Sequence, residues 1–129
     1  NLIESGFLPV VSPIGVGSVG ESYNINADLV AGQLAAALDA DKLILLTNVE
    51  GILEEEDDKD SLISTLAIEE AREMMETGQI AGGMIPKVNS CINALQGGVR
   101  RTHILDGRIS HSLLLEIFTD KGIGTMMTN

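Results

Sequence analysis

The stretch "ADLVAGQLAAALDADKLILLT", Ala27 to Thr47, contains a helix pattern followed directly by a strand pattern. Apolar side chains first recur at the three- and four-residue spacing of an amphipathic helix, at Ala27, Val30, Ala31, Leu34, Ala35 and Leu38. "KLILLT" (Lys42–Thr47) is then a short apolar run of the kind found in buried parallel strands. A helix and a strand in direct succession indicate an α/β domain.

The neighbouring segments extend this alternation. "FLPVVSPI" (Phe7–Ile14) predicts another buried parallel strand, which would complete a strand–helix–strand unit. Further along, the sequence predicts an exposed hairpin or loop, two helices, a strand, a helix and a last strand, at 48–64, 68–77, 83–96, 101–105, 111–118 and 124–128. Together these elements predict a three-layer α/β/α sandwich with a mostly parallel central sheet.

Composition and the first residues of the chain limit the classes of protein to which it can belong. The 129 residues suffice for one domain, and their net charge of −11 argues against nucleic acid or an anionic membrane as partner. The single cysteine, Cys91, fits a reducing compartment such as the cytoplasm, and no apolar run has the length of a membrane span. "NLIESG" at the start resembles the last turn of a helix closed by Gly6, so we expect the chain to be the rear part of a longer protein.

The glycine-rich segment "GVGSVG", Gly15 to Gly20, formally matches the dinucleotide-binding fingerprint of an oxidoreductase. In that fingerprint the third glycine already lies in a helix, whereas here "ESYNI" follows and the helix cannot begin before about Asn26. We therefore favour a glycine-rich hairpin over a dinucleotide site.

The stretch "YNINAD", Tyr23 to Asp28, admits two interpretations. Asn26 is well placed to cap the helix that follows. Asp28 would lie in its first turn, where the positive end of the helix dipole stabilises a negative charge. Alternatively, Asn24 and Asn26, on one side of an extended segment, could hold a carboxylate or amide of a small ligand. The spacing leaves both interpretations open.

A second candidate site is "AGGMIPK", Ala81 to Lys87. Its two glycines allow a close backbone approach, Pro86 suits a first helical turn, and the free N–H groups there form an anion site. The alternative is that Lys87 merely extends from the edge of a buried helix into solvent. The charged run from Glu54 to Asp60 is interpreted as a solvated loop, and the two histidines, His103 and His111, lack partners at metal-ligand spacing.

Four motifs in order then carry a specific resemblance: "ESYNINAD", "KLILLTNVEGIL", "GQIAGGMIPKV" and "HSLLLEIFTDKGIGTM". Over essentially all 129 residues the chain resembles the C-terminal, nucleotide-binding half of the acetylglutamate kinases, a group within the amino acid kinase family. The form "NINAD" favours this group over the carbamate, uridylate, aspartate and glutamate 5-kinases. The resemblance implies the amino acid kinase fold, with the N-terminal amino-acid-binding part absent from residues 1–129.

The resemblance also implies roles for individual residues. Asn24 would contact N-acetyl-L-glutamate, Asn26 would shape the same region, and Asp28 would orient two catalytic lysines, of which one is Lys87 and the other lies in the absent part. The ATP-binding residues implied are Asn48, Val49, Glu50, Gly51, Ile52, Leu53, Gly82, Gly83, Met84 and Lys87. Asn48 replaces the aspartate usual in the family. ATP would arrive with Mg²⁺, and no tightly bound cofactor or protein metal site is implied.

The last motif implies regulation. In arginine-inhibited members of the group this pattern helps to form the L-arginine pocket, which places an effector site at His111, Glu116, Gly122, Gly124 and Thr125. The residues alone predict only a surface helix that passes through a glycine turn into an edge strand. The resemblance further implies a homo-oligomer, typically a hexamer. Relatives in photosynthetic organisms, where the plastid stroma would be the compartment, bind a PII-type signalling protein.

The implied function is transfer of the ATP γ-phosphoryl group to the side-chain carboxylate of N-acetyl-L-glutamate, in arginine biosynthesis. The isolated chain is expected to be inactive, because half of the active site is missing. The alternatives are a non-catalytic nucleotide-binding or regulatory module, and a related kinase such as an N-acetyl-aminoadipate kinase.

Overall fold

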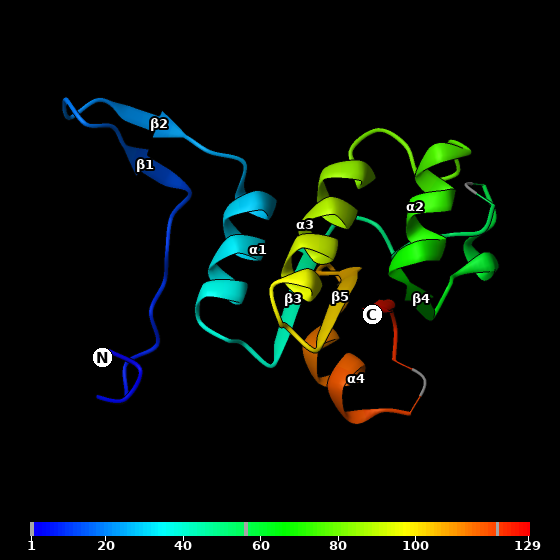
Figure 1. Ribbon diagram of the computed structural model, residues 1–129. Helices are drawn as coiled ribbons and strands as arrows, with labels where there is room; N and C mark the ends of the chain where they lie inside the picture. The colour runs from blue at the N-terminus through cyan, green and yellow to red at the C-terminus, as the bar shows by residue number, and fades with distance from the viewer. Residues whose placement is uncertain (1, 56, 121) are drawn as a thin grey trace.

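The computed structural model describes residues 2–55, 57–120 and 122–129. Its central element is a four-stranded sheet (Figure 1). Its order is β3 (Lys42–Thr47), β5 (Arg101–Asp106), β6 (Thr125–Thr128) and β4 (Thr65–Ala67). β3 pairs with β5 in parallel, as β4 does with β6, whereas β5 and β6 are antiparallel. The prediction of an α/β fold with a mostly parallel sheet is confirmed, with one antiparallel pairing.

Helices pack on both faces of this sheet. On one face, Ile104 of β5 joins the core formed with α1 (Ala27–Ala37) and α3 (Met84–Gln96). The preceding residue, His103, contacts Glu116 of α4 (Ser112–Phe118). Because successive residues of a strand point to opposite faces, α4 lies on the other side of the sheet. The predicted three layers are therefore present at β5, and α2 (Ile68–Glu76) continues directly from β4.

The helices α1 and α3 lie side by side and are unusually close at one point (Figure 1). Gly32 of α1 is buried against Ser90 of α3, where a side chain at position 32 would collide with the serine hydroxyl and its carbonyl. The same hydroxyl donates a hydrogen bond to the backbone carbonyl of Asp28. This contact fixes the first turn of α1 against the N-terminal half of α3, where Lys87 lies.

The prediction of a buried strand at Phe7–Ile14 is wrong. Residues 7–12 lie outside any strand and are exposed, with Leu8 91% and Val10 94% accessible. Strand pairing begins only at β1 (Ile14–Val16), which forms an antiparallel hairpin with β2 (Ser22–Asn24), and β2 leads into α1 (Figure 1). An apolar run becomes a buried strand only when neighbouring chain covers it, and within the described residues no strand pairs with residues 7–12. The carbonyl of Pro13 accepts the N–H of Ile25 at 2.9 Å, next to the hairpin.

The first described residues form a turn closed by Gly6. Its φ is +81°, and the N–H of Phe7 donates to the carbonyl of Leu2 at 3.0 Å while the N–H of Gly6 donates to that of Ile3 at 2.9 Å. These paired bonds are those that close a helix C-terminus, as the sequence predicted for Gly6; Asn1, which that prediction included, lies outside the described residues.

The hairpin predicted after β3 is also present. Leu53 and Leu62 form an antiparallel bridge, and the 3-10 turn η1 (Lys59–Ser61) lies at its tip. Within the part of the chain that the structure describes, no helix combines the length and the hydrophobicity needed to cross a membrane.

Candidate functional site

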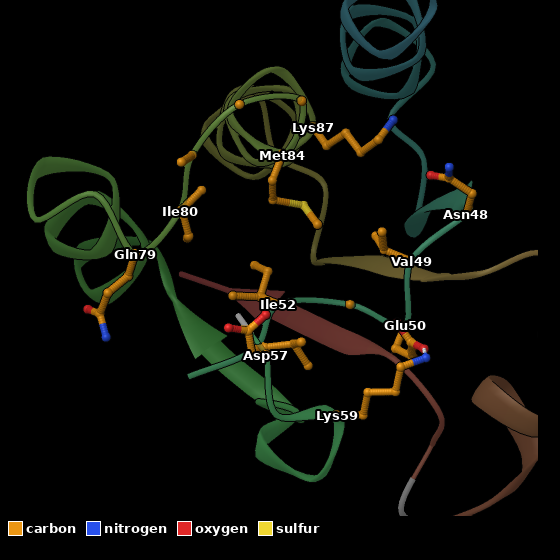
Figure 2. A pocket seen from close by; sticks show the side chains of 15 residues that line it. Asn48, Val49, Glu50, Ile52, Asp57, Lys59, Gln79, Ile80, Met84 and Lys87 are labelled. Atoms are coloured by element: carbon orange, nitrogen blue, oxygen red, sulfur yellow. Dashed lines mark hydrogen bonds and ion pairs between the residues drawn. The ribbon is translucent and has the colours of Figure 1, made fainter. Parts of the chain in front are cut away.

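A pocket of about 730 Å³ lies at the carboxyl end of β3, between the loop that leaves this strand and the segment that enters α3 (Figure 2). Open parallel sheets bind ligands at this edge. The residues that line it are Asn48, Val49, Glu50, Gly51, Ile52, Leu53, Asp57, Lys59, Gln79, Ile80, Ala81, Gly82, Gly83, Met84 and Lys87. Every residue that the resemblance assigned to ATP is among them.

The loop of residues 48–53 is held at its start by the last residue of β3. The Thr47 hydroxyl accepts the N–H of Val49 at 3.0 Å and lies 3.0 Å from its carbonyl, so the chain turns sharply after the strand. The opposite wall begins where α2 ends, and the N–H of Ile80 donates to the carbonyl of Met74 at 2.9 Å. Both walls are therefore fixed by hydrogen bonds before any ligand binds.

The interior of the pocket is apolar and its mouth is charged. Figure 2 shows the side chains of Ile52, Ile80 and Met84 directed into the space between the two walls. At the mouth, Lys59 donates to Glu50 at 2.8 Å, and this bond holds the pKa of the Glu50 carboxyl below its usual value. An apolar interior with a few polar groups at its edge is typical of small-molecule sites.

At one end of the pocket, Lys87 forms an ion pair with Asp28. The Lys87 Nζ lies 3.0 Å and 3.3 Å from the two carboxylate oxygens of Asp28, although 59 residues separate them in sequence. Both side chains are about one-quarter exposed, 24% for the lysine and 21% for the aspartate. The pair is thus formed in the fold and is still accessible to a ligand.

At the helix start predicted as an anion site, two of the N–H groups already donate hydrogen bonds within the turn itself. The N–H of Met84 donates to the carbonyl of Ala81 at 3.2 Å, and that of Ile85 donates to Gly82 at 3.3 Å. Pro86, which lacks an N–H group, lies in the first turn of α3 as predicted. The backbone of Gly82 and Gly83, which carries no side chains, faces the pocket.

The structure separates the two asparagines of "YNINAD". Asn26 caps α1, with its Oδ1 accepting the N–H of Leu29 at 3.1 Å, so the capping interpretation is confirmed for this residue. Asn24 is the exposed last residue of β2. Neither lines the pocket described above, so their contacts with an acceptor substrate stay predictions.

The segment "GVGSVG" forms the tip and flanks of the β1–β2 hairpin. Val16 pairs with Ser22, the N–H of Gly17 donates to the carbonyl of Glu21 at 2.8 Å, and α1 begins only at Ala27. A dinucleotide fingerprint needs this loop to continue directly into a helix. The hairpin interpretation is confirmed and an oxidoreductase site at this position is excluded.

The C-terminal motif brings most of its residues together, with its carboxylate directed inward. One Glu116 oxygen lies 2.7 Å from Nδ1 of His103, and the other accepts the N–H groups of Ile123 at 2.7 Å and Gly124 at 3.0 Å. Burial alone would raise the pKa of Glu116, but these hydrogen bonds outweigh it and the pKa lies below its usual value. In this structure the carboxylate that the resemblance assigned to arginine is already bound internally.

The remaining residues of that motif differ in exposure. His111 is exposed at the N-terminus of α4 with φ +60°, whereas Gly124 and Thr125 are buried at the start of β6. Gly122 lies in the connection between α4 and β6. The surface helix and glycine turn predicted from the residues are confirmed. The predicted edge strand is wrong, because β6 lies between β5 and β4 in the sheet. An effector pocket there stays a prediction.

Sequence reasoning missed part of the pocket. Asp57 and Lys59 belong to the charged run interpreted as a solvated loop, whose member Glu56 lies outside the described residues, yet both line the pocket. Gln79 and Ile80 immediately precede the predicted segment 81–87 and were also missed as lining residues. The one signal in the run was its single lysine among acids, which the structure pairs with Glu50 across the mouth.

Comparisons with known proteins agree with this geometry. The chain matches the amino acid kinase family over residues 1–106. An acetylglutamate kinase from Moorella thermoacetica is 67% identical over 126 residues, which are 98% of this chain and 43% of that protein. The chain therefore spans less than half the length of this curated relative.

Solved structures resemble the fold. The structure of N-acetylglutamate synthase from Neisseria gonorrhoeae complexed with coenzyme A and L-arginine has a TM-score of 0.88 at 33% identity, over 98% of this chain and 29% of that chain. Carbamate kinase from Giardia lamblia bound to AMP-PNP has a TM-score of 0.65 at 25% identity, over 84% of this chain and 34% of that chain. Since the family match covers most of the sequence and the fold agrees, the chain belongs to the amino acid kinase family.

Proposed function

We propose that this chain is the nucleotide-binding C-terminal part of an acetylglutamate kinase, which transfers the γ-phosphoryl group of ATP to the side-chain carboxylate of N-acetyl-L-glutamate. The observation that carries the proposal is the accessible Lys87–Asp28 pair at one end of a pocket lined by all the predicted nucleotide residues. The identity of 67% to a protein of this name supports the choice of acceptor. The complete kinase is this chain joined to the N-terminal part that the proposal requires.

ATP would bind with its base in the apolar interior and its phosphates toward Lys87. Ile52, Ile80 and Met84 supply apolar surface for a planar base. The glycine backbone before α3 allows phosphate oxygens to approach closely. The solved carbamate kinase that resembles this fold was bound to AMP-PNP, a nucleotide analogue, which supports a nucleotide site.

The chemistry requires positioning and positive charge more than proton transfer. An ionised side-chain carboxylate is already a nucleophile, so the site has to align it with the phosphorus and neutralise charge on the phosphoryl oxygens. Lys87 supplies one such charge, and Asp28 holds its ammonium group in place. The second lysine would come from the N-terminal part.

Mg²⁺ would enter as part of the ATP substrate. Among the described residues there is no cluster of three or more histidine, cysteine, aspartate or glutamate side chains that could hold a metal ion. Mg²⁺ is usually held largely by nucleotide phosphates and water, with one or two protein carboxylates.

The acceptor would lie beside the hairpin β1–β2 and the start of α1. Asn24 is exposed there, and the Asn26 side chain uses its oxygen for the helix cap while its amide nitrogen keeps two donors for a ligand. The covering surface would come from the N-terminal part, next to the exposed apolar residues of segment 7–13.

Regulation and assembly form a finer part of the proposal. L-arginine would inhibit the complete kinase through the region of His111, Glu116, Gly122, Gly124 and Thr125, and the enzyme would form a homo-oligomer in the cytoplasm. Arginine could act only by binding one conformation better than another. Because Glu116 is bound internally here, a conformation that accepts a guanidinium would have to release that carboxylate.

A non-catalytic module is the second candidate. It is favoured by the similarity of the fold to a structure named as a synthase, which means that the fold alone does not decide the activity. In a binding module Lys87 would contribute only to the affinity for the nucleotide, and no phosphoryl group would be transferred. Measurement of turnover therefore distinguishes the two functions.

The test is an assay of the complete kinase with Mg²⁺-ATP and a panel of acceptors. We expect phosphorylation of N-acetyl-L-glutamate at roughly 1 to 100 per second, and far slower reaction with N-acetyl-aminoadipate, which is one methylene longer. The 129-residue chain alone serves as the negative control. Binding of ATP without transfer to any acceptor would support the module instead, and preference for the longer acceptor would reassign the substrate.

A further inference from the structure

The first residue of β6, Thr125, is a buried polar residue whose hydroxyl faces the nucleotide loop. Its exposure is 0%, and its Oγ1 accepts the backbone N–H of Ile52 at 2.8 Å, across 73 residues of sequence. Ile52 lines the pocket, whereas Thr125 does not. A hydroxyl from outside the pocket therefore holds one of its walls.

The neighbouring Gly51 allows this close contact. A Cβ atom at position 51 would lie 2.6 Å from the Thr125 Oγ1 and 3.1 Å from the Thr125 backbone nitrogen, closer than side chains tolerate. Any side chain at this position would push the loop away from β6. Because Gly51 has no side chain, the loop can lie directly against Thr125.

The loop of residues 48–53 thus has a hydroxyl anchor at each end. At its start the Thr47 side chain bonds to Val49, and at its end the Thr125 side chain bonds to Ile52. The carbonyl of Ile52 is also occupied, because it accepts the N–H of Ile63 at 2.9 Å. Without the Thr125 hydroxyl, the buried N–H of Ile52 would have to find another acceptor, which requires the loop to move.

Thr125 is itself rigidly held. It pairs with Ile104 in the sheet, and the two residues before it donate their N–H groups to the buried Glu116 carboxylate. A side chain fixed from both sides can fix the position of a loop, whereas a mobile one would follow it.

We propose that Thr125 is a positioning residue of the nucleotide site: its hydroxyl sets the position of Gly51 and Ile52 in the pocket wall and thereby the affinity for the nucleotide. The inference rests on the proposed nucleotide-binding function. It gives Thr125 a direct structural link to ATP binding, which is distinct from a contact with an effector.

The test compares variants of the complete kinase in direct binding of Mg²⁺-AMP-PNP and in steady-state kinetics. Thr125→Val keeps the shape and removes the hydroxyl, and we expect it to weaken AMP-PNP binding about tenfold, since a buried N–H loses its partner. The KM for N-acetyl-L-glutamate should stay within about twofold, because its site lies elsewhere. Thr125→Ser keeps the hydroxyl and should bind the nucleotide like the wild type.

Equal nucleotide affinity in the valine and serine variants, or an equal rise in both KM values for the valine variant, would overturn the inference. If Thr125→Val does not fold, Thr125→Ser and Thr125→Ala differ only by the hydroxyl and give the same comparison. Wild-type protein that binds AMP-PNP but transfers no phosphoryl group would contradict the proposed kinase activity and leave the Thr125 comparison intact.

Discussion

Two of the acid–base pairs that link separate elements of this chain have sharply different surroundings. Asp28 and Lys87 meet at the edge of the nucleotide pocket with about one-quarter of each side chain exposed. His103 and Glu116 meet on the opposite face of the sheet, with 6% and 4% exposed, and the glutamate also accepts two backbone N–H groups. The first pair has access to a ligand, whereas the second has none in this structure.

The difference separates a pair suited to chemistry from one suited to holding the fold. An accessible lysine can exchange part of its bond to a carboxylate for a phosphoryl oxygen as charge develops there. A buried carboxylate whose two oxygens both have internal hydrogen-bond partners stabilises the structure and is costly to remove. Substitutions at these pairs test that division.

Replacement of Lys87 should have the largest effect. In the complete kinase, Lys87→Ala should lower kcat about 10²- to 10³-fold with little change in the KM for N-acetyl-L-glutamate, because the lysine acts on charge formed in the transition state. Steady-state kinetics measure both. The matched control is Lys42→Ala, which removes a lysine that is also paired with an aspartate, at 2.9 Å, but at the opposite end of β3. Equal rates for the two variants would mean that Lys87 is only an edge lysine.

Removal of the buried carboxylate should instead lower stability. Glu116→Ala leaves the N–H groups of Ile123 and Gly124 and the ring of His103 without their partner, which should reduce the free energy of unfolding by about 3 kcal/mol. Urea unfolding of the complete kinase measures this, with the exposed Glu73→Ala as control. A loss below about 0.5 kcal/mol, the usual range of a surface substitution, would contradict the structural role.

A third pair, Asp106 and Arg108, combines a buried carboxylate with an exposed guanidinium, 7% and 63% accessible, and should give the smallest effect. Arg108 donates to Asp106 through its side chain and backbone, and these hydrogen bonds lower the pKa of Asp106 to about 2. Since the folded pKa is below the unfolded value, the pair stabilises the fold above about pH 4, and this stabilisation is lost as the pH falls from about 4 to about 2. Arg108→Gln should therefore be slightly less stable than the wild type at pH 6, and the difference should shrink toward pH 3. A difference that grows on acidification would contradict this sign.

Sequence patterns predicted the elements whose apolar stripes face the core of this chain. The helices α1 and α3 and the strands β3 and β5 carry such patterns and lie where expected. The prediction of a buried strand at Phe7–Ile14 was wrong because an apolar run does not show whether a partner strand is available. The short strand β4 was missed because three residues give too little periodicity.

The site was predictable to different degrees. Spacing in the sequence could not join Asp28 to Lys87, since 59 residues separate them, and only the family resemblance did so. Lys59 was missed because a lysine within an acidic run is usually solvated, and the hairpin that turns it toward Glu50 depends on backbone pairing between Leu53 and Leu62. The inward orientation of Glu116 follows from the turn at residues 122–124, which no local pattern specifies.

The most direct test of the division replaces one carboxylate of each pair with its amide and measures kcat and the free energy of unfolding for both variants of the complete kinase. Asp28→Asn should lower kcat at least tenfold with stability nearly unchanged, because the lysine loses its fixed direction at an accessible site. Glu116→Gln should lower stability by more than 1 kcal/mol and leave kcat of the folded enzyme within about twofold. The opposite pattern, or the same loss of kcat and stability in both variants, would contradict the account.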